Sequence, residues 1–584
     1  MRKVYLIQPN YHSTFQDILH YWIPYSVGII WSYAIQDQDI KNNYSLARII
    51  YAREKIEPTV DSMEDGAVYC FSNYIWNWEY NKTLAKKIKE TYPNSYIVFG
   101  GPQVTNRPLE NSFFKYHPYV NSIILGEGEE SFAILLKNLL EGKKQKIYQS
   151  ARLENLDIPS PYLTGIFDNI INEAPNVRWH GTLETNRGCP FACTFCDWGS
   201  LIYSKVKKFQ IDRVYAELEW MATHKVEYLI VADANFGIFK ERDYDIAKKL
   251  CEVKEQYGLP SNININYNKN SSKEVVDIIK LFSESALSRG MTVSFQSMDE
   301  TVLDNIKRKN LDINKAEEIF DLLGKNQLPS YSELILGLPG ETLDSWKQGM
   351  NKLIAMGQHQ CIDVFHATML ENSELNQLTT REKYNIQTVE IENFMHNISA
   401  NELDMIPEKS RIVRSTNTMP LEDMVDSFMY SWIVVNLHCY GWSQIYIRFL
   451  NANFLVSYEQ FYDMLFKQLI NNKSNVLSKL YYQDRNNLLR YFDDNAEYQK
   501  SISFKDYDIL RDAQKELHKI KEQVEELLAN FVLTEFKNLL VNIDFNKLKE
   551  FQKHYVASKD TTYPYILNLD IGIQNSIFLS LIHI

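Results

Sequence analysis

Three cysteines in one short stretch constrain this chain more than any other feature of its sequence. Cys189, Cys193 and Cys196 stand at C-x3-C-x2-C spacing within Glu184-Thr-Asn-Arg-Gly-Cys-Pro-Phe-Ala-Cys-Thr-Phe-Cys-Asp-Trp-Gly199. Intervals of four and three residues would suit one face of a helix. The glycines on either side, however, favour a loop that wraps around a ligand. The spacing therefore predicts three thiolate ligands in one loop.

The three thiols suit an iron-sulfur cluster better than zinc or a disulfide. Structural zinc sites require four ligands, and no fourth partner follows at a suitable spacing. An odd triplet in a chain without a recognisable signal peptide has no natural disulfide pairing. A cluster held by only three cysteines leaves one iron open to a further ligand. The sequence thus favours a cluster that takes part in chemistry.

Phe195, just before the last cysteine, completes a pattern that resembles the radical S-adenosylmethionine (SAM) superfamily. The resemblance implies that Cys189, Cys193 and Cys196 hold a 4Fe-4S cluster and are the catalytic metal ligands. It also implies that SAM chelates the fourth iron. An electron from the cluster then cleaves SAM to methionine and a 5′-deoxyadenosyl radical, which abstracts hydrogen from an unactivated C–H bond.

Charge and hydropathy exclude several other classes of protein. The 584 residues carry a formal net charge of −12, which argues against binding to nucleic acid or to an anionic membrane. Nothing approaches the ~20-residue apolar span of a membrane helix, and the first residues do not resemble a signal peptide. Seven cysteines, three of them in the triplet, indicate a reducing compartment. We expect a soluble cytoplasmic protein of three or four domains.

Residues 1–145 alternate short apolar runs with helical patterns, which predicts a Rossmann-like, doubly wound parallel sheet. Such sheets bind ligands beyond the carboxyl ends of their strands. Two glycine clusters lie at those expected ends, within residues 98–105 and 125–132. The expected strands are Lys3–Gln8, Ala47–Ala52, Ala67–Ser72, Tyr96–Phe99 and Ser122–Leu125, with helices near 26–36, 79–91 and 129–141.

The two glycine motifs, with the Ser72-Asn-Tyr-Ile-Trp76 segment, resemble the cobalamin-binding domain that precedes many radical SAM domains. No D-x-H-x-x-G motif is present, so the resemblance implies cobalamin without histidine coordination from the protein. Asn73, Tyr74 and Trp76 are expected near the lower face of the cobalt. Ordinary aromatic packing explains Trp76 and Trp78 equally well. The implied cobalamin contacts are Ser72, Asn73, Tyr74, Trp76, Gly100, Gly101, Pro102, Val104, Thr105, Gly126, Glu127, Gly128 and Glu129.

A connector over residues 146–178 leads to a second α/β domain, residues 179–379. Six strand–helix units predict a partial (β/α)6 TIM-like barrel, whose sites lie at the strand C-termini. The cysteine loop follows the first strand, at that end. The expected strands are Gly181–Asn186, Tyr228–Asp233, Asn262–Tyr267, Met291–Ser297, Ser332–Gly337 and Asp363–Met369, and three of the helices are Ile211–His224, Arg242–Gln256 and Lys273–Ser283.

Other strand ends of the barrel resemble the radical SAM pattern. The second strand ends in an acidic variant of the family's SAM amino-group motif, and polar side chains follow the fourth strand. For each polar side chain alone, a strand-end hydrogen bond explains the sequence equally well. The resemblance implies SAM contacts from Phe195, Asp233, Asn235, Gln296, Ser297, Arg308, Gly337 and Leu338.

Residues 380–584 form the last predicted domain and are mostly α-helical. Leu421–Trp442 predicts a helix dense in aromatic residues, suited either to a helix core or to a cap over the barrel mouth. An apolar seam over residues 510–531 has heptad steps, but intramolecular packing explains it better than a coiled coil.

Taken together, the resemblances imply a cobalamin-dependent radical SAM methyltransferase. One SAM methylates cob(I)alamin, a second yields the radical, and the substrate carbon takes its methyl group from methylcobalamin. The implied partners are an organic substrate of unknown identity and an external low-potential electron donor such as flavodoxin or ferredoxin. Two alternatives stay open: a cobalamin-dependent cyclase or rearranging enzyme without methyl transfer, and a non-catalytic iron-sulfur or cobalamin sensor.

Overall fold

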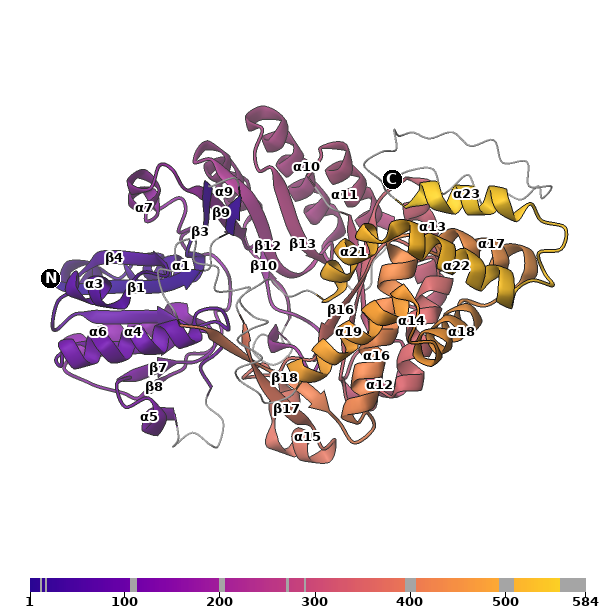
Figure 1. Cartoon of the computed structure of the whole chain (residues 1–584). Helices are drawn as coiled ribbons and strands as arrows, with labels where there is room; N and C mark the ends of the chain where they lie inside the picture. The colour runs from indigo at the N-terminus through magenta and orange to yellow at the C-terminus, as the bar shows by residue number, and fades with distance from the viewer. Residues whose placement is uncertain are drawn as a thin grey trace.

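The computed structural model has an N-terminal α/β part, a central half-barrel and a C-terminal helical part, in that order along the chain (Figure 1). It describes residues 1–10, 13–15, 18–105, 113–198, 205–268, 273–287, 290–393, 406–492 and 509–556. Gly199, which the sequence places after the cysteine loop, lies outside these residues. The predicted α/β fold class is confirmed.

The N-terminal sheet has six strands, all parallel, with helices on both faces. Its strands read as continuous apolar runs because both faces are covered. In sheet order they are β4 (Tyr44–Ala52), β1 (Arg2–Asn10), β5 (Val68–Ser72), β6 (Tyr96–Gly100), β7 (Ser122–Ile124) and β8 (Ile147–Tyr148). One face packs on α1 (Tyr25–Ala34), α2 (Gln38–Asn43) and α6 (Gly128–Leu140), the other on α3 (Ile56–Asp61), α4 (Trp78–Thr91) and α5 (Phe113–Tyr116).

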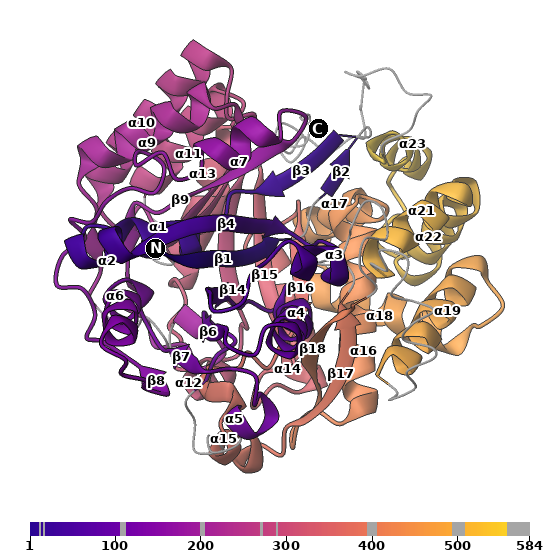
Figure 2. The same cartoon turned by 90° about the vertical axis from the view of Figure 1, so that its left-hand side faces the viewer.

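One hairpin from the N-terminal region leaves its own sheet and joins the barrel. Strands β2 (Ser13–Phe15) and β3 (Ile18–Trp22) are antiparallel, and β3 runs parallel to β9 (Arg178–Leu183), the first barrel strand. Figure 2 shows the pair at the upper right, beyond β1 and β4. The sequence analysis did not predict that this hairpin pairs with the barrel. The pairing joins the two α/β units through backbone hydrogen bonds.

The half-barrel consists of six parallel strands arranged as two groups of three. Backbone pairing joins β9 to β12 and β12 to β13, and separately joins β14 to β15 and β15 to β16. After β9 the strands are β12 (Val226–Phe236), β13 (Asn262–Tyr267), β14 (Met291–Gln296), β15 (Ser330–Leu336) and β16 (Ile362–His366). The helices of this part are α7 (Asp168–Glu173), α9 (Ile211–Thr223), α10 (Lys240–Tyr257), α11 (Lys273–Glu284), α12 (Glu300–Asn305), α13 (Ile313–Lys325) and α14 (Leu343–Ala355).

The C-terminal part begins with α15 (Leu378–Lys383) and an antiparallel hairpin, β17 (Gln387–Asn393) and β18 (Glu408–Ser415). In Figure 1 this hairpin reaches from the barrel toward the N-terminal sheet. The helices that follow pack against α14 and one another, as the predicted core face requires. They are α16 (Leu421–Ile433), α17 (Gln444–Phe454), α18 (Tyr458–Asn471), α19 (Val476–Tyr491), α21 (Ile509–Lys519), α22 (Lys521–Glu535) and α23 (Phe545–Tyr555).

Two details of this part differ from the sequence prediction. The helix predicted over Leu421–Trp442 is α-helical only to Ile433 and continues as a π-helix over Val434–Cys439. The heptad seam is not one continuous helix, because it breaks at Ile520, where φ is −115° and ψ is 28°. The apolar seam packs within the chain, as the intramolecular alternative predicted.

Candidate functional site

The cysteine loop follows β9 and lines a cavity of about 140 Å³ at the C-terminal end of the barrel strands. Cys189 and Cys193 are buried, and Cys196 is half-buried. In the described part of the chain, no three His, Cys, Asp or Glu side chains converge closely enough to hold a single metal ion. All three thiols line this one cavity, so that a cluster bound there could take each sulfur at a different iron.

Arg308 supplies positive charge to the same cavity. Its side chain is 4% exposed, and its Nη2 donates to the carbonyl of Ser294 on β14. Its Nε donates to Oδ1 of Asn310 at 2.8 Å. The thiols of Cys193 and Cys196 are close enough for electrostatic interaction with the guanidinium. This position is compatible with the predicted contact to the SAM carboxylate, since guanidinium groups bind carboxylates well.

Asn235 and Asp233, both at the end of β12, have different surroundings. Nδ2 of Asn235 donates to Sγ of Cys189 at 3.4 Å, and its buried Oδ1 has no partner among the described residues. Asp233 instead accepts backbone hydrogen bonds from Thr185 and Asn186, at 2.8 and 3.1 Å. Burial raises the pKa of Asp233 to about 7. Its carboxyl group holds the chain just before the cysteine loop, so a SAM contact from Asp233 stays a prediction.

Ser297, just after β14, contacts a buried glutamate, Glu341, that the sequence analysis did not single out. Ser297 donates to Oε2 of Glu341 at 2.7 Å, and Ser345 donates to Oε1. Burial raises the pKa of Glu341 to about 7. Gly337, four residues earlier, has a φ of +97° that disfavours other residues. Glu341 follows the predicted SAM contacts Gly337 and Leu338 by a few residues, so that segment was the available signal.

Several polar side chains line the cavity next to the cysteine loop, among aromatic and aliphatic ones. Asn266 on β13, Ser294 and Gln296 on β14, and Glu333 on β15 line the cavity together with the three cysteines and Phe195. Ser294 donates to Glu333, and burial raises the pKa of that carboxyl. Glu333 directly precedes the apolar strand end Leu334-Ile335-Leu336, and this charged residue within a strand was the available sequence signal.

The first glycine motif of the N-terminal domain packs closely on its neighbouring loop. A Cβ on Gly101 would lie 2.6 Å from the backbone oxygen of Asn73, and its φ is +96°. Asn73 is fully buried and donates to the carbonyl of Gly100 at 3.0 Å. Thr105, in the same motif, has a buried hydroxyl without a partner among the described residues. The Asn73 side chain is thus occupied by the loop itself, while Thr105 is free to meet a ligand.

Tyr74 and Trp76 form a stacked pair beyond β5. Their ring centroids are 4.4 Å apart with an interplanar angle of 10°. The Tyr74 hydroxyl lies 2.6 Å from the hydroxyl of Ser26, and the Trp76 indole donates to Oδ1 of Asn10 at 2.9 Å. The stack is therefore fixed at both polar ends and presents a rigid aromatic surface.

The second glycine motif contains an open turn at Gly126 and two carboxylates that accept hydrogen bonds from other parts of the chain. Gly126 has a φ of +73°, and a Cβ there would meet nothing within 4 Å. Glu129 is 2% exposed and accepts a hydrogen bond from Arg187 at 2.8 Å. Glu127 accepts from the backbone of Leu153 at 3.0 Å. The glycine turn is thus free to meet cobalamin, whereas both carboxylates bind other parts of the chain.

The residues present fit the implied groups. Three cysteines and an arginine surround a cavity, as a 4Fe-4S cluster with bound SAM requires. The open turn at Gly126 and the unpartnered hydroxyl of Thr105 suit the close approach of a large ligand such as cobalamin. The individual SAM and cobalamin contacts remain predictions.

Comparisons with known proteins agree with this geometry. Residues 183–353 match the family described as "Radical SAM superfamily". The cobalamin-dependent radical SAM methyltransferase TokK of Streptomyces tokunonensis is 34% identical, over 84% of this chain and 73% of its own length. The 2-(S-pantetheinyl)-carbapenam-3-carboxylate methyltransferase of Streptantibioticus cattleyicolor is 30% identical over the same shares. The structure of OxsB, a cobalamin-dependent SAM radical enzyme, has a TM-score of 0.50 at 15% identity, covering 92% of this chain and 80% of that one, and shows a similar fold.

The cysteine loop on a half-barrel defines a radical SAM enzyme. At 34% identity over most of both chains, this chain belongs to the cobalamin-dependent radical SAM methyltransferases. Its cofactors are a 4Fe-4S cluster, SAM and cobalamin. The two alternatives, a cyclase and a sensor, receive no better support from these relatives.

Proposed function

We propose that this enzyme methylates an unactivated carbon of a bicyclic β-lactam carboxylate that carries a pantetheine arm through a thioether. The observation that carries the proposal is the extent of similarity to the carbapenam methyltransferase. The match spans 511 residues, far more than the radical SAM segment alone. It therefore includes much of the N-terminal or C-terminal parts that surround the barrel.

The cyclase alternative has weaker support. An anaerobic magnesium-protoporphyrin IX monomethyl ester cyclase of Cereibacter sphaeroides is 23% identical over 59% of this chain. The two methyltransferases each cover 84%. Since substrate pockets are built from the parts that differ between families on one fold, the wider match favours the methyltransferase substrate class.

The polar side chains of the barrel lumen suit a substrate with a neutral, hydrogen-bonding arm. Asn264 and Asn266 on β13 are exposed. Glu333 on β15 lies opposite Asp363 on β16, which places two carboxyl groups side by side. Amide and hydroxyl groups of pantetheine match the asparagine amides, whereas a terminal phosphate would be disfavoured beside the two carboxyl groups.

Bound together, the cofactors supply a hydrogen-abstracting radical and a methyl donor that does not require a nucleophilic carbon. The chain's own residues bind and orient them. Arg308 and the cysteine loop hold one end of the site, and the Tyr74–Trp76 stack with the two glycine turns holds the other. An external low-potential protein such as flavodoxin or ferredoxin supplies electrons, and the acidic chain has no nucleic-acid partner.

The test is anaerobic turnover with chemically defined substrates. Reconstituted enzyme is incubated with SAM, cobalamin, reductant and 2-(S-pantetheinyl)-carbapenam-3-carboxylate. We expect a product heavier by one methylene unit or a multiple of it, and a lower rate with the phosphopantetheinyl analogue. Equal rates with the two analogues would contradict the assigned polarity of the lumen. Absence of methylated product from both would contradict the proposed substrate class.

A further inference from the structure

Helix α4 begins directly after the Tyr74–Trp76 stack, but its own N-cap residue does not cap it. The Asn77 side chain makes no hydrogen bond to the first turn of the helix. Its Nδ2 donates to the carbonyls of Pro9 and Ser72, and its Oδ1 accepts from the backbone of Tyr74. The backbone N–H groups at the start of α4 therefore need acceptors from elsewhere.

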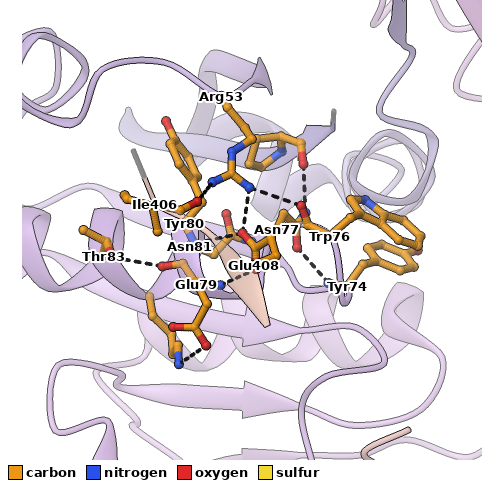
Figure 3. A network of polar contacts seen from close by, with 12 residues as sticks. Arg53, Tyr74, Trp76, Asn77, Glu79, Tyr80, Asn81, Thr83, Ile406 and Glu408 are labelled. Atoms are coloured by element: carbon orange, nitrogen blue, oxygen red, sulfur yellow. Dashed lines mark hydrogen bonds and ion pairs between the residues drawn. The ribbon is translucent and has the colours of Figure 1, made fainter. Parts of the chain in front are cut away.

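Those acceptors come from Glu408, at the start of β18 and more than 300 residues away. Its Oε2 accepts from the backbone N–H of Glu79 at 2.7 Å, and its Oε1 accepts from that of Tyr80 at 3.2 Å (Figure 3). The Glu408 side chain is fully buried. A carboxylate here satisfies the free N–H groups and interacts favourably with the positive end of the helix dipole.

Arg53, just after β4, pairs with Glu408 and reaches the aromatic loop. Its Nη1 donates to Oε1 of Glu408 at 2.7 Å and to the carbonyl of Trp76 at 3.4 Å. Its Nη2 donates to the carbonyl of Ile406 at 2.6 Å, and its guanidinium lies over the ring of Tyr80. The side chains of Arg53 and Glu408 are 3% and 0% exposed, so the ion pair itself is shielded from water.

Through this network the β17–β18 hairpin contacts the N-terminal domain. Figure 3 shows β18 meeting the start of α4, with the Tyr74–Trp76 stack on the far side of Arg53. The hairpin leads through β18 into α16, and α16 packs on α14 of the barrel. The position of the aromatic stack relative to the barrel is therefore set partly by one buried ion pair.

We propose that Arg53 and Glu408 are positioning residues that hold the Tyr74–Trp76 stack at a fixed place against bound cobalamin. The inference rests on the proposed cobalamin site at this loop. The pair binds no reacting atom itself. It acts through the Trp76 carbonyl and the first turn of α4, which lie at the C-terminal end of the segment that carries the stack.

A buried ion pair alone is weak support for a purely stabilising role, because well-packed apolar residues often replace such pairs without loss of stability. The arrangement here does something that apolar residues cannot do. It satisfies two helix N–H groups and two loop carbonyls at once, and so holds three chain segments together. Loss of that register displaces the stack, and displacements of about 1 Å can slow catalysis by roughly 100-fold.

The test compares Glu408→Gln, Arg53→Lys and the double variant Arg53→Met/Glu408→Gln in the full-length protein. Glu408→Gln keeps the acceptor toward α4 but loses the charge pair, and Arg53→Lys keeps the charge but loses the branched contacts. The matched control is Glu390→Gln, which breaks the exposed Lys409–Glu390 pair on the same hairpin. Each protein is loaded with cobalamin and reconstituted with its cluster.

Two readouts are taken: the electron paramagnetic resonance spectrum of the cob(II)alamin state, and S-adenosylhomocysteine formed from SAM under reduction. We expect each of the three variants to change the cobalt hyperfine pattern and to lower S-adenosylhomocysteine formation about tenfold or more, with cluster absorbance intact. Glu390→Gln should match the wild type. Arg53→Lys should lose the least, because it retains the ion pair.

Unaltered cobalt spectra and unaltered rates of S-adenosylhomocysteine formation in variants that bind cobalamin would overturn the positioning role. Loss of thermal stability without spectral change in the folded protein would overturn it too, since it would show a structural role only. A wild-type protein that takes up no cobalamin would instead contradict the proposed cofactor site. The two failures are thus separable.

Discussion

Arg187 donates a hydrogen bond of 2.8 Å to Glu129, and so joins the cysteine loop directly to the second glycine motif of the N-terminal domain. Arg187 stands two residues before Cys189, and its Nε and Nη2 also bind both carboxylate oxygens of Glu184, each at 2.8 Å. The cluster loop and the cobalamin domain are therefore connected by one nearly buried guanidinium. Relative motion between the two cofactor sites would have to break this contact.

The first prediction concerns the charge balance around Arg187. Arg187→Met leaves Glu129 and Glu184 poorly solvated without a counter-charge, which should cost about 3–5 kcal/mol of unfolding free energy. Adding Glu129→Gln should restore part of that loss, because one carboxylate is removed. Urea unfolding of both single variants and of the double variant measures the coupling, with Lys240→Met, which breaks an exposed pair with Glu274, as the control. Strictly additive losses would show that the two residues do not interact.

The second prediction separates two glycines of the cobalamin domain. Gly101→Ala places a Cβ 2.6 Å from the backbone of Asn73 and should disturb the loop itself. Gly126→Ala meets no protein atom within 4 Å, so it should cost the apoprotein only about 1–2 kcal/mol, from its positive φ. Both should lose cobalamin, measured by visible absorbance after desalting, while the cluster still loads. If Gly126→Ala binds cobalamin as tightly as the wild type, the ligand does not approach this turn.

The third prediction follows from the raised pKa of Glu341. The carboxyl is favoured in its protonated form when folded, so between its ordinary pKa near 4.5 and the folded value of about 7 the unfolded chain binds fewer protons. Stability from this group is therefore full at the acidic end of that window and falls as the pH rises, by up to about 1.4 kcal/mol per pH unit. Melting temperatures across the window should decline less steeply in Glu341→Gln. The same slope in both proteins would contradict the assignment.

The fourth prediction tests the cluster ligands. Changing Cys189, Cys193 and Cys196 together to Ala should abolish the cluster's visible absorbance and the formation of 5′-deoxyadenosine, because the described cavity holds no other thiols. Cys251→Ala and Cys361→Ala, which lie elsewhere, should keep both signals. A full cluster in the triple variant, or a preference of the wild type for zinc, would show that the loop has another use.

The sequence predicted those features that depend on local patterns. Strand–helix alternation located both parallel sheets, and the spacing of Cys189, Cys193 and Cys196 located the cavity. The contact between Arg53 and Glu408 could not be predicted, because 355 residues separate the two and neither belongs to a local motif. The pairing of the β2–β3 hairpin with the first barrel strand was also not predicted, because short strands carry little periodic signal.

Carboxylates near glycine turns show a second limit of sequence reasoning. Glu127 and Glu129 were predicted to contact cobalamin because they belong to the glycine motif. In the structure Glu129 binds Arg187 and Glu127 binds the backbone of Leu153. A motif identifies which residues lie at a site, but the partner of each side chain depends on chain segments that the motif does not contain.

The central claim, that both cofactors act in one methyl transfer, is tested most directly by turnover with SAM labelled in its methyl group. With 2-(S-pantetheinyl)-carbapenam-3-carboxylate as substrate, we predict labelled product and equal amounts of S-adenosylhomocysteine and 5′-deoxyadenosine for each methyl group transferred. Unlabelled product, formed with 5′-deoxyadenosine but without S-adenosylhomocysteine, would contradict methyl transfer and favour a rearrangement.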